Sequence, residues 1–233
     1  MARTPLLMLP GLLLDRRLFA AQIDALAGVA EVTVGDLSAH HELGALAEAL
    51  LTRAPERFAL AGLSMGGYVA LEILRRAPHR VTRLALLDTQ ARADDEAATE
   101  RRLGQIAAAE RGELEAVLDA LLPGWVHPDR GDDGELMTLL RAMARGIGRD
   151  GFIREMRTIM SRPDSRGMLG SIACPTLVLC GRQDGSTPVE RHEEMAAAIT
   201  RATLVVLPAC GHLSPLEQPE AVSAQLRVWL ESD

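Results

Sequence analysis

The stretch FALAGLSMGGYVALEILRRA, residues 58–77, determines the fold expected for this chain. Residues 58–63 form an uninterrupted apolar run, which is typical of a strand covered on both faces of a parallel sheet. The pattern from residue 65 onward is helical, so Gly62-Leu63-Ser64-Met65-Gly66 joins a predicted strand to a predicted helix. A Gly-x-Ser-x-Gly turn at such a junction lifts a serine hydroxyl clear of a sheet. Ser64 is therefore the candidate nucleophile.

Short apolar runs alternate with longer helical patterns along most of the chain, and this alternation is typical of strand–helix–strand units around a parallel sheet. We expect six strands, at residues 5–9, 29–34, 58–63, 83–87, 176–180 and 203–207. We expect helices against the sheet at residues 15–27, 41–54, 65–77, 189–200 and 219–231. The predicted fold class is α/β, with helices on both faces of a central parallel sheet.

Residues 93–168 interrupt this alternation, because they contain helical patterns and no convincing strand. Their apolar residues recur at steps of three and four, which predicts about four short amphipathic helices. Gly124, Pro128 and the segment 131–134 separate these helices. We therefore predict a core domain made of residues 1–92 and 169–233, with residues 93–168 inserted as a helical cap.

A serine hydroxyl is a weak nucleophile unless a histidine accepts its proton and an acid orients that histidine. His212 follows the last predicted strand and Asp184 follows the fifth, and the carboxyl ends of parallel strands meet at one edge of a sheet. The order Ser64, Asp184, His212 therefore predicts a catalytic triad. Asp88, at the end of the fourth strand, is the alternative acid. The helix that begins at Met65 presents its N–H groups to this edge, so the Met65 N–H is a candidate oxyanion donor.

These residues resemble the α/β-hydrolase family over nearly the whole chain, specifically its small cap-bearing esterase and carbon–carbon hydrolase branch. The resemblance implies a parallel six-stranded α/β-hydrolase sheet without the family's common leading strand pair. It also implies that the Leu12 N–H completes the oxyanion hole, although Pro10 stands where such proteins typically carry histidine. Haloalkane dehalogenases and epoxide hydrolases carry aspartate at the position of Ser64, so halide displacement is disfavoured.

Five apolar residues flank the predicted catalytic residues: Leu12, Leu13, Leu14, Met65 and Leu213. They predict a largely apolar pocket, although ordinary core packing explains Leu13, Leu14 and Leu213 equally well. Trp125 is expected either to line the pocket or to anchor the cap helices. We name Leu13, Trp125 and Leu213 as candidate substrate-binding residues. The expected partner is a small molecule with an apolar acyl or aromatic part.

The formal charge of −7 and the absence of a basic cluster argue against a nucleic-acid partner. Paired arginines at 16–17, 75–76 and 101–102 lie on predicted helices beside acidic residues, and we expect them on solvated faces. The three cysteines and the remaining histidines, which include His192, show no metal-ligand spacing, so we expect no metal or cofactor and place these histidines at the surface. No apolar run approaches the roughly 20 residues of a membrane helix. We expect a cytoplasmic monomer or homodimer.

Three functions are compatible with these residues. The first is a serine hydrolase that cleaves a small carboxylic ester through an acyl-enzyme, without a cofactor. The second keeps the triad but acts on a carbon–carbon bond, a thioester or a lactone, or as a lyase. The third is a ligand-binding or scaffold protein that retains the fold without turnover. The complete set of triad residue types favours the first two.

Overall fold

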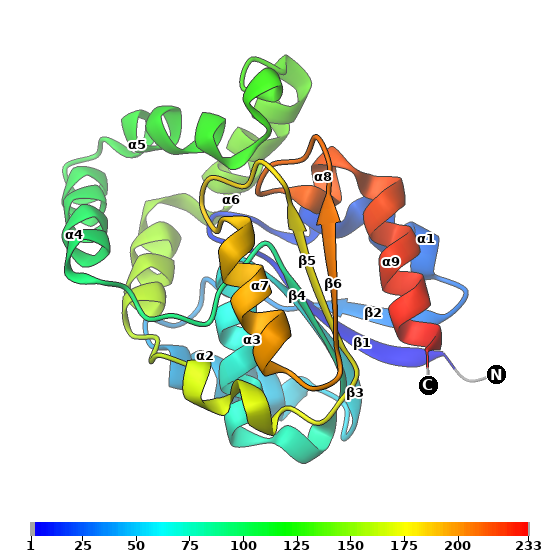
Figure 1. The fold of residues 1–233 in the computed structure, drawn as a ribbon. Helices are drawn as coiled ribbons and strands as arrows, with labels where there is room; N and C mark the ends of the chain where they lie inside the picture. The colour runs from blue at the N-terminus through cyan, green and yellow to red at the C-terminus, as the bar shows by residue number, and fades with distance from the viewer. Residues whose placement is uncertain (1–2, 233) are drawn as a thin grey trace.

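A six-stranded sheet forms the centre of the computed structural model, which describes residues 3–232 (Figure 1). The strands follow the order β2-β1-β3-β4-β5-β6, and all neighbouring pairs are parallel. Their bounds are Thr4–Leu9 for β1, Ala30–Val34 for β2, Phe58–Leu63 for β3, Val81–Leu87 for β4, Thr176–Gly181 for β5 and Ala202–Leu207 for β6. Every predicted strand is present, and the predicted fold class is confirmed.

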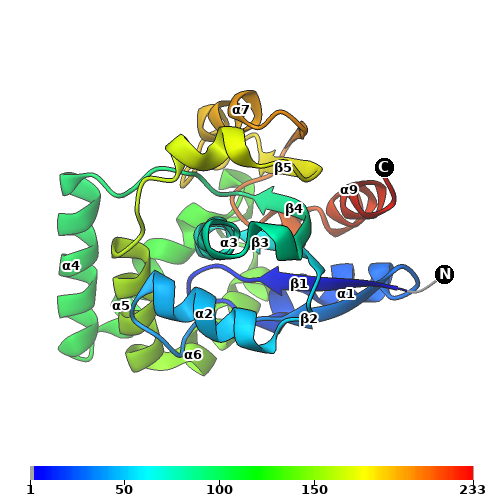
Figure 2. The ribbon, with the colours of Figure 1, turned by 90° about the horizontal axis from the view of Figure 1, so that it is seen from below.

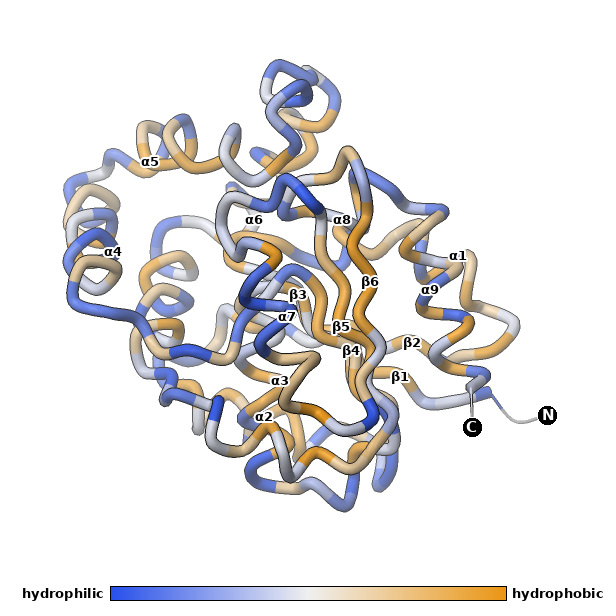
Figure 3. Tube along the Cα trace, viewed as in Figure 1, coloured by the Kyte–Doolittle hydropathy of each residue, from blue (hydrophilic) through white to orange (hydrophobic). Residues whose placement is uncertain are grey.

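The strands of the sheet are among the most apolar segments of the chain, as the hydropathy colouring shows (Figure 3). All residues of β3 and β5 are buried, whereas the edge strands β2 and β6 are partly exposed. The register places Leu9 beside Gly62 and Leu63 beside Leu87. The chain segments that leave β1, β3 and β4 therefore start at the same edge of the sheet, which is the edge where ligands bind in open parallel sheets.

Helices cover both faces of the sheet (Figure 2). One face carries α1 (Ala20–Leu26) and α9 (Pro219–Glu231), which contact each other. The other carries α2 (Leu43–Arg53), α3 (Met65–Arg76) and α7 (Val189–Ala198). The helix predicted at 15–27 begins instead as a short 3-10 turn, Arg16–Phe19, and a short helix not predicted from the sequence, α8 (Ser214–Glu217), precedes α9.

The segment between β4 and β5 is helical, and its three main helices lie together beyond the ends of α2 and α3 (Figures 1 and 2). They are α4 (Glu96–Glu110), α5 (Leu114–Leu121) and α6 (Gly134–Met160), with short 3-10 turns at Leu122–Trp125, Pro128–Arg130 and Arg166–Ser171. Gly148 interrupts α6 with φ 70° and ψ 178°, so this span consists of two helices, as the sequence predicts. The predicted helical insertion is present, while its boundaries at 93 and 168 stay a prediction.

A buried carboxylate connects α6 to the loop that follows β1. Glu155 is 1% exposed and accepts the Leu13 N–H at 2.8 Å. Burial raises the pKa of Glu155 to about 8, while the Leu13 hydrogen bond acts in the opposite direction. Because this pKa lies above the usual 4.5, the folded protein still holds a proton here at neutral pH, whereas the unfolded chain has already released it.

We predict that Glu155→Gln changes the pH dependence of stability. Between the two pKa values the folded state binds more protons than the unfolded state, so wild-type stability falls as pH rises through this range. Glutamine keeps an acceptor oxygen for Leu13 and cannot ionise. Relative to wild type, the free energy of unfolding of the variant should increase by about 2 kcal/mol or more between about pH 5 and about pH 8, measured by denaturant titration. The exposed Glu31→Gln serves as control, and equal pH responses of the two variants would contradict the prediction.

Candidate active site

The turn between β3 and α3 holds Ser64 in a strained conformation, with φ 52° and ψ −115°. Two close approaches impose it. A Cβ atom on Gly62 would lie 2.3 Å from the Gly66 carbonyl oxygen, and one on Gly66 would lie 2.1 Å from the Leu9 carbonyl oxygen. Only glycine fits at either position, and the surrounding backbone fixes the serine in a region that L-residues rarely occupy.

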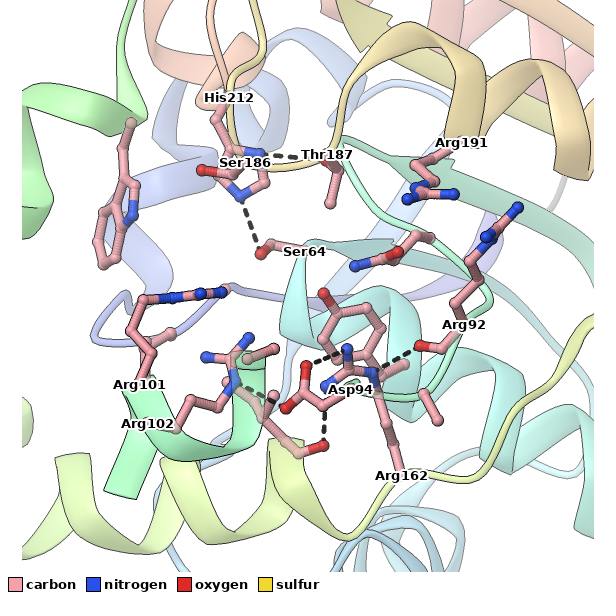
Figure 4. Close-up of a pocket in the computed structure, with 18 of the residues that line it drawn as sticks. Ser64, Arg92, Asp94, Arg101, Arg102, Arg162, Ser186, Thr187, Arg191 and His212 are labelled. Carbon is pink, nitrogen blue, oxygen red and sulfur yellow. Dashed lines mark hydrogen bonds and ion pairs between the residues drawn. The ribbon is translucent and has the colours of Figure 1, made fainter. Parts of the chain in front are cut away.

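The structure brings Ser64, His212 and Asp184 together. His212 Nε2 lies 2.9 Å from Ser64 Oγ, and His212 Nδ1 lies 2.8 Å from Asp184 Oδ2. Figure 4 shows the imidazole above the serine, with this contact drawn as a dashed line. Residues 148 positions apart in the chain thus lie within hydrogen-bond distance, in the arrangement that serine hydrolases use to activate a hydroxyl.

Three donors besides the histidine hold the Asp184 carboxylate. Oδ1 accepts the backbone N–H groups of Ser186 and Thr187, and Oδ2 accepts the Thr187 hydroxyl at 2.7 Å. The sequence predicts Thr187 as the cap of the next helix. In the structure α7 begins at Val189 and its N-terminal flanking residue is Pro188, so the threonine side chain is available to orient the acid.

The charge of Asp184 makes the His212 imidazole more basic than usual. Burial by itself lowers the pKa of His212, but the charge and hydrogen bond of Asp184 outweigh it and raise the pKa above its usual value. For Asp184, burial raises the pKa, and the His212 charge and the hydrogen bonds bring it below the usual range. The carboxylate is therefore ionised beside a histidine that holds a proton readily.

Asp88, the alternative acid, has other partners. It is fully buried and accepts the Gly181 N–H at 3.0 Å and the Ser214 hydroxyl. Burial, followed by the negative charge of Asp184, raises its pKa well above the usual range. The carboxylate that accepts the Nδ1–H of His212 is that of Asp184.

Two buried residues, Thr89 and His192, also stabilise the turn that carries Ser64. The Thr89 hydroxyl donates to the Ser64 carbonyl at 2.7 Å, and the Thr89 N–H donates to His192 Nε2 at 2.9 Å. Burial lowers the pKa of His192 to about 4, which keeps the imidazole neutral and able to accept. The prediction of His192 as a surface residue is wrong, because α7 packs its histidine against the end of β4.

The helical segment between β4 and β5 holds the loop that carries His212. The His212 N–H donates to the Trp125 carbonyl at 3.0 Å. The Glu217 carboxylate accepts the N–H groups of Gly211 at 3.0 Å and His127 at 2.7 Å. Residues 125–127, from the helical segment between β4 and β5, therefore contribute to the position of the imidazole, and no local sequence pattern indicates this contact.

The loop after β1 lies against the serine. A Cβ atom on Gly11 would be 3.4 Å from Ser64 Cβ. Within residues 3–232, the N–H groups of Leu12 and Met65 donate to no protein acceptor, so both predicted oxyanion donors are available. Leu13, by contrast, has φ 60° and donates its N–H to Glu155.

A cavity of about 810 Å³ opens beside Ser64 and His212. Leu12, Trp125 and Leu213 line it, whereas the fully buried Leu13 does not, because its side chain packs in the core. The walls also carry six arginines: Arg92, Arg101, Arg102, Arg162, Arg166 and Arg191. All of them except Arg166 are labelled in Figure 4. The pair at 101–102 therefore lies in the cavity wall and not on a purely solvated face, and the pocket is more polar than the sequence predicts.

Residues 3–232 show neither a metal-binding cluster nor a membrane-spanning helix. No group of three or more His, Cys, Asp and Glu side chains in this range is arranged to hold a metal ion. No helix in the same range has the length and apolar composition needed to cross a membrane.

Comparisons with known proteins agree with this geometry. A thermophilic esterase from Thermogutta terrifontis, solved with malate bound, is 31% identical, with a TM-score of 0.89 over 97% of this chain and 89% of that protein. A pimeloyl-(acyl-carrier protein) methyl ester esterase of Neisseria meningitidis is 26% identical over 93% of this chain and 90% of its own length. A protein of the same name from Nitrosomonas europaea is 27% identical over 76% of this chain and 73% of its own length.

The family assignment rests on the length of the match as well as on the fold. The sequence profile of the alpha/beta hydrolase family matches residues 6–225, which include all six strands except the first two residues of β1, and the helical insertion. The chain belongs to the alpha/beta hydrolase family.

Proposed function

We propose that this chain hydrolyses small carboxylic esters, with Ser64 as nucleophile, His212 as general base and Asp184 as the acid that orients the histidine. One observation carries the proposal: a single imidazole joins Ser64 Oγ, at 2.9 Å, to Asp184 Oδ2, at 2.8 Å. The esterase names of the relatives support the choice of an ester as the bond that is cleaved.

The reaction proceeds in two halves. His212 Nε2 accepts the Ser64 proton as Oγ attacks the ester carbonyl carbon, and the N–H groups of Leu12 and Met65 donate to the oxyanion that develops. The imidazolium, stabilised by Asp184, then protonates the departing alcohol and leaves an acyl-enzyme. Water attacks this intermediate with His212 again as base, which releases the carboxylic acid and restores the serine.

The walls of the cavity support an acyl group with an apolar part next to the reacting carbonyl. Leu12, Leu14, Trp125 and Leu213 contribute apolar surface there. The name of the bacterial relatives specifies a methyl ester of an acyl chain. A short or medium acyl chain esterified to a small alcohol fits both the apolar lining of the cavity and the kind of ester named for the relatives.

Replacing the nucleophile tests the assignment directly. Ser64→Ala should abolish turnover of p-nitrophenyl acetate and butyrate and prevent labelling by a fluorophosphonate probe, because no other group replaces Oγ. Mass spectrometry should map the wild-type label to Ser64, and the exposed Ser171→Ala should behave as wild type. Retained turnover in Ser64→Ala would reject the proposal. Labelling at Ser64 without ester turnover would favour the other bond types, and folded protein without label would favour a non-catalytic role.

The pH profile tests the histidine and its acid. The base works only when neutral, and the neighbouring carboxylates raise its pKa, so kcat/KM should fall with decreasing pH with a midpoint above the usual 6.5. Asp184→Asn should lower kcat by about 10³- to 10⁴-fold and shift this midpoint downward. Asp88→Asn should cause a much smaller loss. A loss as severe in Asp88→Asn as in Asp184→Asn would instead assign the orienting role to Asp88.

A further inference from the structure

Four of the six cavity arginines form ion pairs with three carboxylates. Asp94 binds both Arg102, at 2.8 Å, and Arg162, at 2.7 Å. The remaining two pairs are Arg92 with Glu194, at 2.7 Å, and Arg166 with Asp164, at 2.6 Å. Arg162 also stacks over the Tyr68 ring, with its guanidinium carbon 4.3 Å from the ring centroid. These four guanidiniums have protein partners and form part of the cavity wall.

The other two arginines have no such partner. Within residues 3–232, the side chains of Arg101 and Arg191 form no hydrogen bond and no ion pair. Both line the cavity, Arg101 from α4 and Arg191 from α7. In Figure 4 their guanidinium groups lie on opposite sides of Ser64. The space next to the nucleophile therefore has uncommitted cationic donors on two sides.

The charge of the cavity is opposite to that of the chain. Six guanidiniums face four carboxylates, those of Asp94, Asp95, Asp164 and Glu194. The Asp95 carboxylate accepts the Ala98 N–H at the start of α4, so it is also occupied. The cavity walls therefore carry a net positive charge, although the formal charge of the whole chain is −7. A substrate that is entirely neutral would leave this excess uncompensated when it displaces water from the cavity.

We propose that the cavity selects esters that carry a free carboxylate at the end of the acyl chain, that is, monoesters of small dicarboxylic acids. The inference rests on the function proposed above and adds the substrate class. A planar carboxylate matches the two parallel N–H groups of one guanidinium, and such charge-assisted pairs are stronger than neutral hydrogen bonds. With the ester carbonyl at Ser64, the acyl chain runs toward one of these two arginines, which pairs with the free carboxylate, while the other adds to the positive potential of the cavity.

The test compares a monoester with its neutral counterpart of the same length. Monomethyl succinate, glutarate and adipate are measured against the corresponding dimethyl esters, by following the methanol released. For at least one chain length, wild type should show kcat/KM about tenfold or more higher for the monoester, since hydrogen bonds to charged groups contribute at this level. The advantage should shrink as salt concentration rises, because the charges are partly exposed.

Variants connect the preference to the two arginines. Arg101→Gln and Arg191→Gln should each reduce the monoester-to-diester ratio, and the double variant should bring it close to one. Arg101→Glu should lower the ratio further than Arg101→Gln. The ratio is measured within each protein, so a partial folding defect affects both substrates equally. Arg57→Gln is the matched control, because Arg57 is exposed just before β3, at the end of the sheet opposite Ser64.

Each outcome decides between the two proposals. Turnover of diesters by wild type without any monoester advantage overturns the inference and leaves the ester hydrolase proposal intact. An advantage that persists in the double variant overturns the role of these arginines. A stronger preference for a phosphate-ended ester of equal length overturns carboxylate as the ligand. Failure to cleave any ester, with no labelling of Ser64, rejects the proposed function itself.

Discussion

The close backbone approach at the end of β3 is the constraint on which the rest of the site depends. A Cβ atom on Gly62 would lie 2.3 Å from a carbonyl oxygen and one on Gly66 would lie 2.1 Å from another, so neither position tolerates a side chain. This packing holds Ser64 at φ 52° and directs its hydroxyl away from the sheet. The strain is local, and its cost is offset by the burial of every residue of β3 and of residues 84–87 at the end of β4.

A second layer of polar contacts keeps the ends of the strands in register with this turn. Thr89 after β4 holds the Ser64 carbonyl, and Thr187 after β5 holds the Asp184 carboxylate. His192 on α7 accepts the Thr89 N–H as a neutral imidazole. These groups are buried and hydrogen-bonded, and buried polar groups with complete sets of partners specify one arrangement. The rigidity of the triad geometry therefore comes from residues outside the triad.

The helical insertion does more than cover the cavity. It supplies the Trp125 carbonyl that fixes the histidine loop and the Glu155 carboxylate that fixes the loop after β1. It also contributes Arg101, Arg102 and Arg162 to the cavity wall. The same segment thus holds two of the loops that border the cavity and supplies part of the charge of the cavity walls. A change in how these helices pack would affect catalysis and selectivity together.

The alternation of apolar runs and helical patterns was sufficient to predict the six strands, the helices on both faces and the inserted helices, because these features depend on neighbours along the chain. The Gly-x-Ser-x-Gly turn and two polar residues after later strands indicated Ser64, Asp184 and His212 for the same reason. Other features required the folded chain. Leu13 and Glu155 are 142 positions apart, and Arg101 belongs to a helix whose sequence resembles a solvated surface. Such contacts depend on how separate helices pack, a long-range property that no local pattern encodes, and so the buried His192 and the basic cavity emerged only from the tertiary structure.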